Sequence, residues 1–110
     1  MAEYLQVQTT VESEAEGARL ARSIVEARLA ACVQVTGPVS SVYRWQGEVE
    51  ETEERQLFIK TAVDRFPELE AHINAYHSYD TPEIIAVPIT GSTEYLEWIS
   101  QEITRTGTSS

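Results

Sequence analysis

The sequence predicts an α+β domain of the ferredoxin-like (split βαβ) type, a sandwich in which one antiparallel sheet carries helices on one face. Apolar residues alternate with polar ones over 4–11, and β-branched and aromatic residues fill 32–61, as in strands. Three other stretches repeat apolar residues at intervals of three and four, as in helices. The resulting order is strand, helix, strand, strand, helix, strand, helix. A split βαβ fold with an extra C-terminal helix accommodates this order of elements with short, right-handed connections.

The first strand and helix follow from residues 4–30. Leu5, Val7 and Val11 share one face of the strand, with polar residues on the other. Ser13 and Glu16 match a capping box, in which a hydroxyl and a carboxylate satisfy free amide donors at a helix start. The spacing of the apolar residues after Glu16 predicts a helix that ends near residue 30.

Residues 32–61 predict one long β-hairpin. Gln46 and Gly47 form the expected turn, because glycine supplies the positive φ that a two-residue loop needs. That turn sets Trp45 opposite Glu48 and Tyr43 opposite Glu50, and a bulge at 37–38 explains a slip in the apolar alternation. Each limb reaches roughly 40–50 Å, whereas a compact chain of this length has a radius of gyration of about 13 Å. The outer half therefore lacks a core of its own, which predicts an oligomer.

The second half of the chain predicts a helix, a strand and a final helix. Asp64 is the expected cap of the first of these helices, with Pro67 in its first turn. An apolar run over 84–89, interrupted by Pro88, predicts a strand. The last helix follows residues 91–92 and ends near 103. Residues 1–103 thus form a single domain, and we expect the apolar-free stretch 104–110 to be a disordered tail.

The composition restricts the classes of partner. Eighteen acidic against eight basic residues give a formal charge of −10, which repels nucleic acid and anionic membranes. The single cysteine excludes an internal disulfide. The start of the sequence lacks the basic and apolar regions of a signal peptide, and no run is long enough to span a bilayer. We therefore expect a cytoplasmic protein.

Several short motifs, each weak alone, stand in order over nearly the whole chain. They are Leu29-Ala-Ala-Cys-Val33, Ser41-Val-Tyr43, Trp45-x-Gly47, Ile59-Lys-Thr61, His77-x-Tyr79-Asp80, Pro82-Glu-Ile-Ile85 and Tyr95-Leu-x-Trp-Ile99. As a set they resemble the CutA family of divalent-cation tolerance proteins. The resemblance implies a ferredoxin-like fold in a PII-like homotrimer, whose long hairpins join the sheets of neighbouring subunits. It also implies a cytoplasmic role in tolerance of copper and other divalent metals, without an enzymatic activity.

Cys32 and His77 are the metal ligands that the resemblance suggests. A thiolate and an imidazole are both good copper donors. Cys32 could instead be a buried side chain that only packs, which is favoured because free cysteine is among the most buried residue types. His77 could instead cap the end of the second helix, where its charge and donor suit the exposed carbonyls. Tyr76 and Ser78 stand where relatives often have a second histidine and a proline, so two adjacent imidazoles are not available. In the split βαβ order the two candidates lie far apart within one subunit, and we expect that they do not share one metal ion.

A second candidate set combines aromatic and charged residues expected at subunit boundaries. Such residues line small-molecule clefts, although interface packing also enriches tyrosine and tryptophan. Lys60 could instead form an ion pair with a carboxylate of the acidic run 48–54. That run is more typical of a solvated strand edge than of a cation-binding site. The residues expected to line this intersubunit cleft are Tyr43, Trp45, Lys60, Tyr79 and Glu83.

No nucleophile and base stand in a recognisable catalytic pattern, and His72 is expected to face solvent. The sequence therefore predicts a protein that is not an enzyme and has no organic cofactor. The main hypothesis is a homotrimeric copper-tolerance protein that binds divalent metal weakly or indirectly. One alternative is a PII-like signalling trimer that binds a small molecule between subunits, and another is a trimeric module that contacts a partner protein.

Overall fold

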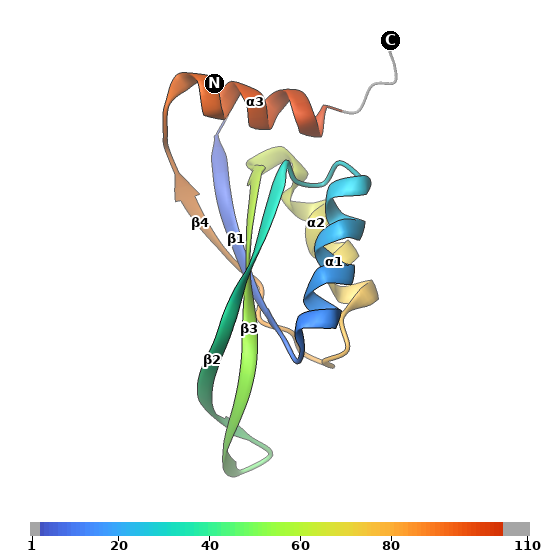
Figure 1. The fold of residues 1–110 in the computed structure, drawn as a ribbon, viewed down its shortest axis with the longest axis vertical. Helices are drawn as coiled ribbons and strands as arrows, with labels where there is room; N and C mark the ends of the chain where they lie inside the picture. Colours follow the sequence, from blue (N-terminus) through green and yellow to red (C-terminus); the bar gives the residue numbers. More distant parts are fainter. Residues whose placement is uncertain (1–2, 105–110) are drawn as a thin grey trace.

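The predicted split βαβ sandwich is confirmed by the computed structural model, which describes residues 3–104. Its sheet has the order β2-β3-β1-β4, and each of the three neighbouring pairs is antiparallel. Helices α1 and α2 lie on the same side of this sheet, and α3 crosses one of its ends (Figure 1). The elements in chain order are β1 (Tyr4–Val11), α1 (Glu14–Glu26), β2 (Cys32–Trp45), β3 (Glu48–Ala62), α2 (Phe66–Tyr76), β4 (Ile85–Ile89) and α3 (Thr93–Ile103).

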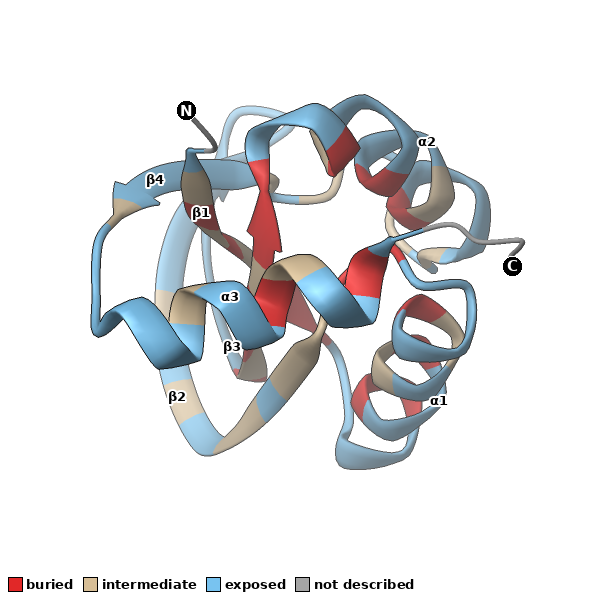
Figure 2. Cartoon of the chain, turned by 90° about the horizontal axis from the view of Figure 1, so that it is seen from above, coloured by how far each residue is buried: buried red, intermediate tan, exposed pale blue. Residues whose placement is uncertain are grey.

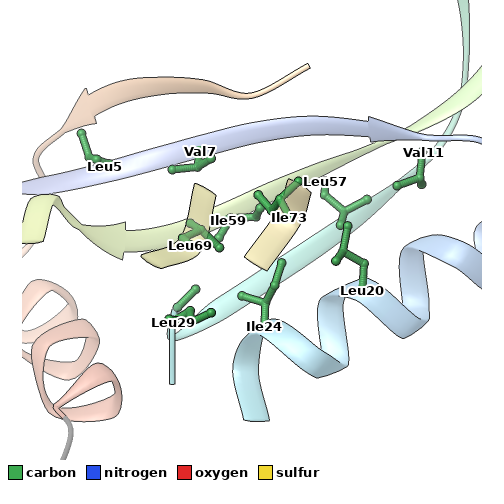
Figure 3. Close-up of a cluster of buried hydrophobic side chains, with 11 residues drawn as sticks. Leu5, Val7, Val11, Leu20, Ile24, Leu29, Leu57, Ile59, Leu69 and Ile73 are labelled. Atoms are coloured by element: carbon green, nitrogen blue, oxygen red, sulfur yellow. The ribbon is translucent and has the colours of Figure 1, made fainter. Parts of the chain in front are cut away.

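The main core lies between the sheet and the two helices α1 and α2 (Figure 3). The alternating residues of β1 predicted to face inward do so, since Val7 and Val11 have no exposed surface. A smaller cluster forms where α3 crosses the sheet end and buries Ile99 and Ile103 against Ala62. The side chains of the main core are Leu5, Val7, Val11, Leu20, Ile24, Leu29, Ala30, Leu57, Ile59, Leu69 and Ile73.

The hairpin of β2 and β3 has the predicted register. Trp45 pairs with Glu48 and Tyr43 with Glu50, and the register shifts between Val35 and Pro38, at the predicted bulge. Gly47 has a φ of 83° in the turn. The hairpin projects beyond the body of the molecule (Figure 1). The whole chain, hairpin included, has a longest dimension of 50 Å and a radius of gyration of 14.9 Å. Its outer half has no core in the single chain.

The sheet face opposite α1 and α2 is uncovered. In register, Lys60 and Val87 flank Gln6, and Phe58 and Ile85 flank Gln8, so these side chains share that face. Ile85 and Val87 of β4 are 46% and 40% exposed. Most of β4 is accordingly pale blue, the colour of exposed residues, in Figure 2. Apolar surface thus remains open on this face as well as on the hairpin.

Helix α1 ends at Glu26, earlier than the sequence predicted. The N–H groups of Arg28 and Leu29 donate to the carbonyls of Val25 and Ile24 at 3.0 and 3.1 Å, which is a Schellman ending. Arg28 takes the left-handed conformation that usually calls for glycine, with φ at 58°. Because no glycine marks the position, the sequence does not reveal this ending.

Asp64 does not cap α2, contrary to prediction. A 3-10 turn, Val63–Arg65, leads into the helix, and Arg65 precedes it without a side-chain cap. Arg65 is instead buried, and its guanidinium donates to the carbonyl of Arg28 at 3.0 Å and contacts the carboxylate of Glu68. The hydrogen bond from Arg65 to the carbonyl of Arg28 fixes the end of α1. It links the start of α2 to Arg28, the residue in the left-handed conformation.

The predicted tail lies almost wholly outside the described residues. Thr104 ends α3, and its hydroxyl donates to the carbonyl of Ser100 at 2.6 Å. In the described part of the chain, no helix is long and apolar enough to cross a membrane.

Candidate functional site

A groove opens where the outer half of the hairpin leaves the body and meets the loop between α2 and β4. This loop runs across the end of the sheet from which the hairpin projects (Figure 1). The groove has a volume of about 730 Å³, within the range of small-molecule sites. Its lining residues are Thr10, Ser41, Val42, Tyr43, Trp45, Glu54, Tyr79, Asp80, Thr81, Pro82 and Glu83.

His77 fixes the loop that forms one wall of the groove. Its side chain has no exposed surface. Its Nε2 lies 2.7 Å from the carbonyl oxygen of Thr10, and its Nδ1 accepts the N–H of Tyr79 at 3.0 Å. Because the carbonyl can only accept, Nε2 carries the proton and Nδ1 the lone pair. Both ring nitrogens therefore already have partners within the chain.

Glu16 ties the same loop to the start of α1. One carboxylate oxygen accepts the N–H of Glu12 at 3.2 Å and the other accepts the N–H of Ser78 at 3.1 Å. Burial alone would raise the pKa of this carboxyl. The hydrogen bonds from Ser78 and Glu12 outweigh burial and lower the pKa of Glu16 below its usual value. The predicted cap is also confirmed, since Ser13 accepts the N–H of Glu16 at 3.2 Å.

The floor of the groove is acidic. Glu54 is only 7% exposed and accepts a hydrogen bond from the Tyr79 hydroxyl at 2.7 Å. Burial, and then this bond to a carboxylate, raise the pKa of Tyr79. Burial and the charge of Glu54 also raise the pKa of Glu83. The lining therefore concentrates negative charge in a partly dehydrated place.

Four of the five residues predicted for a cleft meet in this groove, namely Tyr43, Trp45, Tyr79 and Glu83. Lys60 does not join them. Its ammonium group donates to the side-chain oxygen of Gln34 at 2.7 Å, on the uncovered face of the sheet. Glu54 was not among the predicted cleft residues, because it belongs to the acidic run 48–54 that was predicted to be a solvated edge. Only its position as the last acid before the apolar part of β3 distinguished it.

Cys32 and His77 lie apart, as the topology predicted. Cys32 is half-buried and stands opposite Lys60, which stands opposite Gln6 of β1. His77 bonds to Thr10, four residues farther along β1, so the two positions are separated by roughly 13 Å along the sheet. Within residues 3–104, no three histidine, cysteine or acidic side chains gather closely enough to hold a metal ion.

His72, the other histidine of the chain, does not face solvent, contrary to prediction. His72 is half-buried and its Nε2 lies 2.8 Å from the hydroxyl oxygen of Ser23. That hydroxyl donates its proton to the carbonyl of Leu20 at 2.9 Å, so the imidazole must be the donor to Ser23. Burial also lowers the pKa of His72. The pair therefore links α1 to α2, and in this arrangement the imidazole donates to the serine instead of accepting its proton.

Comparison with known proteins gives one consistent family. The model of the CutA1 divalent ion tolerance protein family matches residues 5–102. The divalent-cation tolerance protein CutA of Thermus thermophilus is 46% identical over 93 residues, which are 84% of this chain and 90% of the relative. Chloroplastic protein CutA of Arabidopsis thaliana is 48% identical over 94 residues, 84% of this chain but 52% of the relative, so the chain spans about half of that protein.

Solved structures agree with the sequence matches. Cut A1 from Thermus thermophilus superposes with a TM-score of 0.85 at 45% identity, covering 87% of this chain and 94% of the other. CutA1 from Oryza sativa superposes with a TM-score of 0.89 at 40% identity, covering 94% and 96%. At these identities the likeness extends beyond the fold to much of the sequence.

Proposed function

This chain belongs to the CutA1 divalent ion tolerance family, and from that premise we propose that it serves divalent-cation tolerance as a homotrimer that binds divalent metal weakly or indirectly. The observation that carries the proposal is the state of His77. Copper would have to displace a hydrogen bond at whichever ring nitrogen it used. A buried donor or acceptor left without its partner costs about 1–3 kcal/mol, which lowers the affinity of any site built on this residue.

The uncovered apolar surface supports the homotrimer. Val42 and Val49 on the outer hairpin are each 65% exposed, and Ile85 and Val87 are exposed on the open sheet face. Monomeric proteins seldom leave such apolar surface in contact with water. Neighbouring copies of the chain that cover both regions would complete the fold that a single chain leaves open.

Copper titration of the intact oligomer tests the metal-binding proposal. We expect Cys32→Ser and His77→Ala each to change the dissociation constant for Cu²⁺ by less than about threefold, measured by calorimetry. Thermal melting shows whether each variant is folded, and His77→Gln is the second variant if the alanine form is not. A tenfold loss of affinity, equivalent to about 1.4 kcal/mol, would assign copper to that residue and overturn the proposal of weak or indirect binding.

Sedimentation tests the homotrimer. We expect a single species of three times the chain mass at micromolar concentration, with the chain well folded. A folded single chain at the same concentration would contradict both the trimer and any role for neighbours at the groove.

The groove favours a second candidate function, a PII-like signalling trimer that binds a small molecule. Its volume suits such a ligand, and its walls combine aromatic rings with buried polar groups. Because one wall is the hairpin, a neighbour packed against that hairpin also stands near the groove. Ligand occupancy would then be coupled to the way subunits pack, which is how such a protein signals.

Two further parts of the proposal concern chemistry and location. We propose that the chain is not an enzyme, because the Ser23 hydroxyl already donates to a carbonyl and His72 donates to Ser23. We also propose a cytoplasmic location, which the lack of a cysteine pair for a disulfide supports. Among relatives, the Arabidopsis protein is named chloroplastic and the Archaeoglobus fulgidus structure periplasmic, so fractionation of the native cell is the test.

A further inference from the structure

We propose that the groove beside the hairpin binds a small organic cation, an alkylammonium or guanidinium compound with an apolar body. This inference rests on the ligand-binding candidate function above and names the chemical class of the ligand. It follows from three properties of the groove: buried negative charge without a counter-ion, aromatic walls, and a size that suits a molecule larger than a metal ion.

The negative charge is the first property. Glu54, Asp80 and Glu83 line the groove, and its lining includes no lysine or arginine. Glu54 is more than nine-tenths buried, yet among the described residues its only hydrogen bond comes from the neutral Tyr79 hydroxyl. Within residues 3–104 neither glutamate forms an ion pair. A buried carboxylate without a counter-charge is costly, so a bound cation stabilises this arrangement and an anion is repelled.

The aromatic walls are the second property. Tyr43 and Trp45 stand on the hairpin, and Tyr79 stands on the opposite loop. Aromatic faces attract ammonium and guanidinium groups through the negative charge of the ring face. They also pack against the carbon atoms of an organic ion. Rings therefore add affinity for an organic cation that a hydrated metal ion does not obtain.

The third property separates an organic cation from a metal ion. Hard metal ions need several oxygen ligands at about 2.0–2.6 Å, and the described residues contain no such group of acidic side chains. The groove is instead about 730 Å³ in volume. Its carboxylates, with aromatic rings beside them, fit a compound whose charged end is attached to an apolar chain.

Calorimetry with the intact oligomer tests the inference at about 150 mM salt, where long-range attraction is screened. The test ligands are agmatine and n-butylammonium as cations, n-butyrate as the anion and n-butanol as the neutral compound. We expect only the two cations to bind. In a Trp98→Phe background their binding also changes the fluorescence of Trp45, which places the ligand at the hairpin wall.

Matched charge variants separate the groove from the overall negative field. Glu54→Gln and Glu83→Gln are expected to weaken agmatine binding at least tenfold, whereas Glu97→Gln, an exposed position on α3, changes it less than twofold. All three remove one charge, so the variants have the same net charge and differ in where the charge is lost. The amide at position 54 still accepts from Tyr79, and Glu83→Gln carries the test if the other variant does not fold.

Each other outcome overturns the inference in a distinct way. Binding of n-butyrate or n-butanol in preference to the cations would leave the groove as a ligand site but refute the cationic class. An equal loss in Glu97→Gln would show nonspecific attraction by an acidic protein. If none of the compounds binds, an adjoining copy's basic side chain or no ligand fills the groove, and the small-molecule function fails as well.

Discussion

Replacement of Glu16 by glutamine is expected to destabilise the protein, because the carboxylate joins three segments. It accepts N–H groups from Glu12, before α1, and from Ser78, in the loop beside the groove. It also lies near His77, with 3.9 Å between its oxygen and Nδ1. Glutamine keeps the shape of the side chain but has only one oxygen, so one of the two N–H groups must face an NH₂ group.

The magnitude follows from those two bonds. A hydrogen bond to a charged group contributes about 1.5–3 kcal/mol, and a buried N–H without a partner costs about 1–3 kcal/mol. Since the side chain is only 11% exposed, solvent compensates little. We therefore expect Glu16→Gln to lower the free energy of unfolding by about 2–3 kcal/mol per chain near neutral pH. Glu14→Gln, at an exposed position in the same helix turn, should cost about 0.5 kcal/mol or less.

Urea denaturation at one fixed chain concentration measures both effects, since subunit association contributes to stability. The pH dependence adds a second test. Because the folded-state pKa of Glu16 is lowered, its contribution is present above its unfolded pKa and is lost as the pH falls through the folded pKa. The difference between parent and Glu16→Gln should therefore shrink below about pH 4.

Two results would refute this reasoning about Glu16. One is a loss no larger than that of Glu14→Gln near neutral pH. The other is a difference between parent and variant that stays constant, or grows, as the solution is acidified. Either result would mean that the carboxylate charge does not hold the loop beside the groove.

Two other predictions concern the hairpin turn and the groove. Gly47→Ala should lower the free energy of unfolding by about 1 kcal/mol, because φ is 83° there and alanine is strained in that conformation. Gly37→Ala is the control and should be neutral, because the added methyl group meets open space. Equal urea unfolding midpoints for the two variants would contradict this prediction. Burial and the bond to Glu54 raise the pKa of Tyr79 above the usual tyrosine value, so Tyr79→Phe should remove an absorbance change from the high-pH end of the alkaline titration. The stabilisation by Tyr79 is present below about pH 10 and lost as the pH rises further, and an unchanged titration in the variant would disprove the assignment.

Local patterns were sufficient for most of the fold. The alternation in β1, the Gln46-Gly47 turn and the Ser13 hydroxyl cap of α1 each involve residues close together in the chain. Such features depend on backbone geometry and on the side chains of near neighbours, which a sequence displays directly. The strand order then followed, because short connections leave few arrangements for these elements.

The end of α1 shows where local patterns fail. Nothing near Arg28 marks a left-handed residue, since the usual glycine is missing. Its carbonyl is held by Arg65, thirty-seven positions away. The energy that makes this conformation acceptable thus comes from a distant side chain.

The groove was likewise decided by contacts between distant parts of the chain. Aromatic and acidic residues on the hairpin and the loop suggested a cleft, but Glu54 is buried with a hydrogen-bond partner, Tyr79, that lies twenty-five positions away. The loop itself is held by bonds from His77 to Thr10 and from Ser78 to Glu16, over 67 and 62 positions. A sequence displays which side chains can ionise or bond, whereas their burial and partners depend on how the folded segments meet.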